Sequence, residues 1–153
     1  MKTKLLIIYM LIFTSQVFAG EVDDNILKLK KTNSCVDCYL VGANLSKANL
    51  SNANLSNANL SNANLSNANL LNANFSNANL SNVDFAFATV SRANLSNANL
   101  SFANLEFANF SFANLSNVNL SNANLSNVDF GMAKFPHSKE TLLVQGFPSF
   151  ATT

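Results

Sequence analysis

The chain has 153 residues, of which only 11% are charged, and it contains no tryptophan. The length suits one domain, but the composition excludes an ordinary mixed fold, because Asn, Ala, Leu and Ser recur in a fixed order with a period of five. Disorder is also excluded, since a large apolar residue arrives once in every repeat. A formal net charge of +1 gives no long-range attraction to nucleic acid or anionic membranes.

Residues 1–19 are typical of a secretory signal peptide. Lys2 and Lys4 give a basic start, and the apolar stretch that follows ends at a small-residue cleavage signature, Val17-Phe18-Ala19. A membrane anchor is the alternative, but the stretch is about 14 residues whereas a spanning helix needs roughly 20. Cleavage after Ala19 leaves seven of the nine basic residues against eight acids, a formal charge of −1. We therefore expect an extracytoplasmic protein, periplasmic or secreted, with no stable membrane insertion.

Residues 20–37 form the segment that we expect to cap the repeats. The repeats that follow, described below, are expected to wind into a solenoid, which is a stack of coils. Such a stack needs a cap because its first coil otherwise exposes an apolar, unpaired edge. A short helix is predicted from Asp23 or Asp24, as the N-cap, to about Lys31. Its expected apolar side comprises Ile26, Leu27 and Leu29. The alternative is a frayed linker after the signal peptide.

Cys35 and Cys38 lie in register with the repeats that follow them. In the repeat described below, a small inward residue stands two positions before each large inward residue. Cys38 stands two residues before Leu40 and Cys35 stands five residues before it, so both side chains should point inward. In an exported protein this pair favours a disulfide. Reduced thiols packed as small apolar groups are the main alternative, and a redox site is a weaker one. A metal site is not predicted, because two thiols and the distant His137 cannot supply four ligands.

Residues 38–135 carry the five-residue repeat. Large apolar residues occupy every fifth position from Leu45 to Phe130, and Ala or Val stands two residues before each. In a helix, five residues advance about 500°, so these side chains would point in all directions. In a flat strand an odd period sends successive side chains to opposite faces. A chain that bends once per repeat at Ser-Asn satisfies the pattern, with Ala and Leu inward and the Asn between them outward.

Ala43-Asn44-Leu45-Ser46-Lys47, Ala53-Asn54-Leu55-Ser56-Asn57 and their successors resemble the pentapeptide-repeat family over residues 38–135. The resemblance implies an all-β fold, a right-handed quadrilateral β-helix with four pentapeptides per coil. The 20 large inward positions from Leu40 to Phe135 then make about five coils. With adjacent coils ~4.8 Å apart, the stack would be about 24 Å long.

The outward corner position before each small residue is usually Asn, but it is apolar at five places. These are Phe87, Phe102, Phe107, Phe112 and Met132. On the four-sided coil that the resemblance implies, Phe107 lies above Phe87 and Met132 above Phe112. Leu71 is a single exception at another outward position. Clustered exposed apolar residues favour a partner surface, whereas local packing of the rings over the coil edge is the alternative.

Residues 136–153 form a tail or cap in which Ser138–Gln145 can make a helical turn or two. The tail contains four apolar residues that are suited to cover the last coil: Leu142, Leu143, Phe147 and Phe150. A homodimer formed through this end is the competing interpretation.

The repeats hold few groups that can exchange protons. Residues 40–135 contain no His and no Cys, and their charged residues are Lys47, Asp84, Arg92, Glu106, Asp129 and Lys134. The abundant Ser residues have no base beside them. This inventory predicts neither an enzyme nor a cofactor site.

The remaining hypotheses are binding roles. Some pentapeptide-repeat proteins mimic DNA and bind gyrase through an acidic face, but three acids against three bases and an export signal disfavour that role here. Regular outward Ser and Asn could order water, as an ice-binding surface does, although these residues also suit tight corners. The sequence favours a non-catalytic exported binding or structural scaffold that contacts an unknown protein through its Phe-rich corners.

Overall fold

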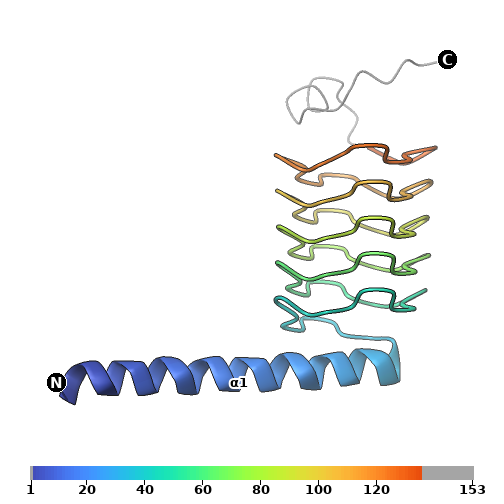
Figure 1. Cartoon of the computed structure of the whole chain (residues 1–153). Coiled ribbons are helices and arrows are strands. Elements are labelled where there is room, and N and C mark those ends of the chain that lie inside the picture. Colours follow the sequence, from blue (N-terminus) through green and yellow to red (C-terminus); the bar gives the residue numbers. More distant parts are fainter. Residues whose placement is uncertain (1, 136–153) are drawn as a thin grey trace.

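The computed structural model describes the backbone of residues 2–135 and the side chains of residues 17–135. One helix, α1 (Lys2–Thr32), is followed by a stack of coils that reaches residue 135. Figure 1 shows α1 running across the end of the stack, roughly perpendicular to the direction in which the coils pile up. The predicted tail, with its helical turn and its four apolar residues, lies outside the described residues.

α1 begins earlier than the sequence pattern predicted. Asp23 and Asp24 lie inside a continuous helix of 31 residues, so neither is an N-cap. Nothing between Lys2 and Asp24 forces a break, because Gly20 weakens a helix without ending it and Pro is absent there. The end was predicted well: after Thr32, Asn33 has a left-handed φ of 54°, and its N–H donates to the Leu29 carbonyl at 2.8 Å.

The coils pair through single residues that are 20 positions apart. Parallel bridges run from Ser34↔Asn54 to Asn114↔Lys134, and within residues 2–135 no strand is longer than such a bridge. Each straight piece is only Ala-Asn-Leu before the next corner, which is too short for an extended ladder. Main-chain hydrogen bonds still join every layer: the Leu55 N–H donates to the Asn74 carbonyl, and the Asn74 N–H to the Ala53 carbonyl, both at 2.8 Å.

The interior is filled by the predicted inward positions. From Leu40 to Leu120 the large central side chains are almost fully buried, as are nearly all the Ala and Val residues two positions before them. Phe85 contacts Phe75 and Phe110 inside the stack, edge to face, at centroid distances of 6.0 and 6.1 Å. Each buried Leu or Phe contributes about 1.5–3 kcal/mol before conformational entropy is subtracted. The predicted inward placement is therefore confirmed.

α1 covers the first coil with a different stripe from the predicted one. Leu29 is completely buried, and Val22 and Ile26 pack partly buried against the core. Leu27 points away from the coils and is 64% exposed, so its prediction as a packing residue is wrong. The reason is helix geometry: positions 22, 26 and 29 share one side of a helix, whereas Leu27 is rotated about 100° from Ile26.

Candidate interaction surface

The corners of the coils use a backbone conformation that restricts which residues fit. Every described corner residue from Asp37 to Met132 has a positive φ, between 55° and 68°, and most of them are Asn. Asn tolerates this left-handed region because its short amide side chain hydrogen-bonds locally, whereas bulky residues are disfavoured there. The corner geometry thus explains the recurrent Asn of the sequence.

Four corners carry Phe in this disfavoured conformation. Phe87, Phe102, Phe107 and Phe112 have φ values of 57–60°, and Met132 has 57°. Burial does not offset the backbone cost of these residues, because the Phe rings remain 49–59% exposed and Met132 is 81% exposed. A strained, exposed, apolar residue where Asn would fit better is a feature that stability alone does not explain.

Corner positions 20 residues apart form columns along the stack. In the Phe107 column, which includes Phe87, the two rings stack with centroids 5.1 Å apart and planes at 8°. In the Phe112 column, which includes Arg92 and Met132, the guanidinium carbon of Arg92 lies 5.6 Å from the Phe112 centroid. The predicted stack of Phe107 on Phe87 is present. The cation–π contact was not predicted, although the spacing of 20 residues between positions 92 and 112 could have revealed it.

The apolar corners do not all point the same way. Phe102, Phe107 and Phe112 occupy three successive corners of one coil, so their rings project from three different edges of the stack. Phe102 has corner Asn residues, Asn82 and Asn122, one coil before and after it, and it has no ring contact within the described residues. The sequence-predicted patch is therefore one pair of columns plus one separate ring.

The outward Asn residues are largely occupied with each other. Asn54 Oδ1 accepts the Ser56 N–H at 3.2 Å and the Ser56 hydroxyl at 2.9 Å. The Asn74 amide donates to Asn54 Oδ1 at 3.3 Å, and this ladder continues through Asn94 to Asn114. These pairs hold the outward amides in a fixed orientation along the stack.

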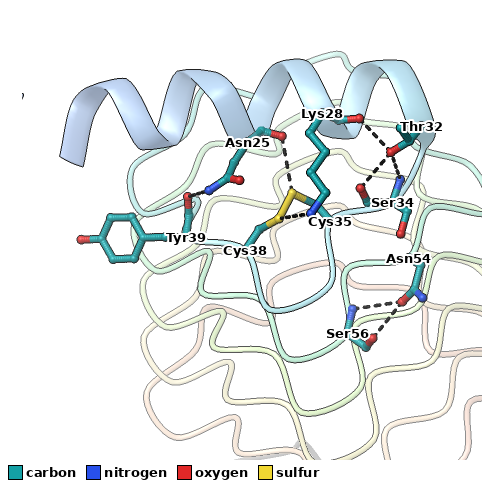
Figure 2. The surroundings of a disulfide bond; sticks show 9 residues. All are labelled: Asn25, Lys28, Thr32, Ser34, Cys35, Cys38, Tyr39, Asn54 and Ser56. Atoms are coloured by element: carbon teal, nitrogen blue, oxygen red, sulfur yellow. Dashed lines mark hydrogen bonds between the residues drawn. A yellow bond between two sulfur atoms is a disulfide. The ribbon is translucent and has the colours of Figure 1, made fainter. Parts of the chain in front are cut away.

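The cysteines lie between α1 and the first coil (Figure 2). Cys35 and Cys38 are joined by a disulfide with Cα atoms 5.3 Å apart, and both side chains are buried. The Lys28 ammonium lies 3.7 Å from the Cys38 sulfur, and the Asn25 amide donates to the Tyr39 carbonyl at 3.1 Å. The Cys35 sulfur is 3.4 Å from the Asn25 carbonyl, which is a packing contact because a disulfide sulfur has no hydrogen to donate.

The rest of the described surface offers little chemistry. Among the described residues, no group of three or more His, Cys, Asp or Glu side chains could hold a metal ion. No described helix is both long and apolar enough to cross a membrane. The site that remains is the pair of aromatic corner columns.

Comparisons with known proteins agree with this geometry. The family described as pentapeptide repeats matches residues 34–70, 58–97 and 93–131, with eight copies. The comparison with curated proteins finds no match.

Solved structures of pentapeptide repeat proteins are similar to the chain, HetL and Rfr23 among them. HetL, a pentapeptide repeat protein involved in heterocyst differentiation regulation from the cyanobacterium Nostoc sp. strain PCC 7120, is 31% identical with a TM-score of 0.50. That match covers 66% of this chain and 52% of HetL, so the chain spans about half of HetL. Rfr23, a pentapeptide repeat protein from the cyanobacterium Cyanothece 51142, is 31% identical with a TM-score of 0.47, covering 75% of this chain and 95% of Rfr23. The likeness implies a right-handed quadrilateral β-helix, in agreement with the 20-residue spacing of the bridges.

Proposed function

Because the chain belongs to the pentapeptide-repeat family, we propose that it is a non-catalytic, exported binding protein whose two aromatic corner columns, the Phe107 column and the Phe112 column, contact another protein. The family is one of structural repeats and is generally not enzymatic, which fits the poor proton-exchange chemistry of the coils. The observation that carries the proposal is the exposure of Phe at left-handed corners where Asn is the rule.

Phe at an exposed corner has a backbone cost with little compensating burial. A bulky residue in the left-handed region costs about 1–2 kcal/mol relative to ordinary backbone, and an exposed ring gains little burial in return. The three Phe residues of the two columns, Phe87, Phe107 and Phe112, together carry a cost that a partner surface would offset by burying their rings. A binding role accounts for both the strain and the exposure.

The export part of the proposal rests on residues 1–19 and on the cysteines. A basic start, an apolar stretch and the Val17-Phe18-Ala19 signature support cleavage after Ala19. A disulfide is stable outside the reducing cytoplasm, so the Cys35–Cys38 pair suits that location. Mass spectrometry of the protein recovered from periplasm or culture medium should give a chain beginning at Gly20, and a cytosolic, uncleaved chain would contradict export.

The binding part is tested with a triple variant. Phe87, Phe107 and Phe112 are changed together to Asn, the residue that most other corners carry, so the coils should remain folded. The tagged wild type should retain a partner from periplasm or medium, and the triple variant should lose it. Equal retention by a folded triple variant would remove the Phe corners from the function.

A further inference from the structure

The exposed apolar side chains of the coils are concentrated on one side of the stack. We call this side, between the Phe107 column and the Phe112 column, the Phe face. Five of the six exposed large apolar residues of the coils belong to it: Leu71, Phe87, Phe107, Phe112 and Met132. Leu71, which looked isolated in the sequence, lies between the two columns, one coil before Ser91. Only Phe102 lies elsewhere.

The other sides carry fewer exposed apolar residues. On two of them, every outward residue between the corners from residue 54 to 121 is Asn or Ser. Many of the Asn amides on these two sides pair with each other along the stack. The fourth side shares the Phe87 and Phe107 corners with the Phe face and has Phe102 at its other edge, but it carries two carboxylates, Asp84 and Glu106, between its corners. The Phe face therefore presents five exposed apolar residues, against three beside two carboxylates on the fourth side, and is the better surface for a partner that buries apolar area.

The Phe face also carries one charge of each sign over residues 67–132. Arg92 lies over the Phe112 ring, one coil before it, and Asp129 lies one coil after Asn109. The Asp129 carboxylate accepts the Gly131 N–H at 2.8 Å. Neither side chain forms an ion pair within the described part of the chain. The two charges thus flank the coil of Phe107 and Phe112, one on each side along the stack.

We propose that a second copy of this chain covers the Phe face, side by side and antiparallel, which rests on the binding function proposed above. A two-fold axis through the coil of Phe107 and Phe112 reverses the order of the coils. The coil of Arg92 in one copy then lies opposite the coil of Asp129 in the other, twice by symmetry. Phe112 lies opposite its own counterpart. The face is complementary to itself in both charge and apolar character.

The area of the face can be compared with the area that a stable dimer buries. A half-exposed aromatic or large aliphatic side chain leaves on the order of 100 Å² outside, so the five apolar residues present about 500 Å². A stable interface buries about 800 Å² on each partner, and the polar strip between the columns can supply the remainder. The dimer is therefore at the small end of stable interfaces, with an expected Kd on the order of micromolar.

The first test measures the oligomeric state by sedimentation equilibrium up to about 200 µM, well above the expected Kd. Phe107→Asn with Phe112→Asn should weaken self-association at least about tenfold, because central aromatic residues dominate interfaces. Phe102→Asn is the matched control, since it makes the same exchange at another corner, and it should change Kd less than about twofold.

The second test exchanges the two charges. Arg92→Asp and Asp129→Lys should each weaken the dimer about tenfold, and the double variant should regain most of the affinity. Both replacements have precedents in this chain: Asp37 occupies a corner with a φ of 55°, and Lys134 occupies the repeat position equivalent to Asp129.

Three results overturn the inference. They are a wild type that stays monomeric throughout the range, a dimer that persists unchanged in the Phe107/Phe112 variant, and single charge variants that have no effect or no rescue. A monomeric wild type that still retains a different protein, in a Phe-dependent way, refutes the dimer and keeps the proposed function. A wild type that neither self-associates nor retains a partner refutes both.

Discussion

At the scale of single residues, the corners and the interior make opposite demands. The corner requires a residue that tolerates a left-handed backbone, and the central position requires a large apolar side chain without polar atoms. Asn and Leu meet these requirements in most repeats. A residue that does not meet them, such as Phe at a corner, is informative, and its effect can be tested by substitution.

Phe102→Asn should stabilise the fold. Phe102 is 59% exposed, has a φ of 59° and stacks on no other ring within the described residues, so little packing is lost. Asn relieves a backbone cost of roughly 1 kcal/mol, which should raise Tm by about 2–5 °C. Thermal unfolding followed by circular dichroism measures the change. The reciprocal change, Asn97→Phe in a column of Asn corners, should lower Tm; a lower Tm for Phe102→Asn would mean that the ring packs usefully despite its exposure.

Leu100→Asp should open a coil. Leu100 is completely buried, and a carboxylate there would have no partner within the interior, at a cost of more than about 4 kcal/mol. Since a domain of this size has a stability of only about 5–15 kcal/mol, the melting curve should shift strongly or broaden. Leu100→Met is the control and should cost less than about 1.5 kcal/mol. An Asp variant that melts like the wild type would contradict the inward placement of Leu100.

At the scale of elements, the coils were predictable and α1 was less so. The period of five placed Leu45 and Ala43 inward without knowledge of any neighbour, because corner and interior are set within each repeat. The start of α1 was missed, since a capping residue such as Asp23 signals a helix start only where the preceding residues are not helical themselves. Leu27 was misplaced because the stripe on α1 is selected by the coil beneath it.

The disulfide should hold the junction between α1 and the first coil. Closing the four-residue Cys35–Cys38 segment removes about 2 kcal/mol of unfolded-state entropy. A reductant should therefore lower the Tm of the protein by several degrees. The matched variant places Leu at position 35 and Ala at position 38, the residues that the repeat uses in those positions. Its Tm should not respond to reductant, and a wild type that is equally indifferent would contradict the disulfide.

At the scale of the whole molecule, function depends on a spacing that no single repeat contains. The Phe face exists because positions 87 and 107 differ by 20, the length of one coil. The sequence could predict that stack only through the family resemblance, since a period of five alone does not give four sides. The grouping of Leu71 with Phe112 was missed, because the two residues occupy different repeat positions and meet only when the sides of the coil are defined.

Two deletions of equal length test whether binding depends on the arrangement of the Phe face while folding does not. Removing residues 52–61 or 92–101 takes out two repeats each, and the deleted segments differ only in Asn52 against Arg92. Both chains should fold with similar melting curves, because every remaining residue keeps its inward or corner position and neighbouring coils interact alike along a solenoid.

Only the second deletion should destroy binding. Deletion of 52–61 lies before the Phe face and leaves Phe87 and Phe107 one coil apart. Deletion of 92–101 shifts everything after it by half a coil, so Phe107 moves to the corner opposite the Phe87 column and the stack is lost. In sedimentation equilibrium only the variant lacking 52–61 should still self-associate, and in the retention assay only this variant should still hold a partner. If the chain lacking 92–101 binds as well as the chain lacking 52–61, the position of the rings around the coil has no role, and only their presence matters.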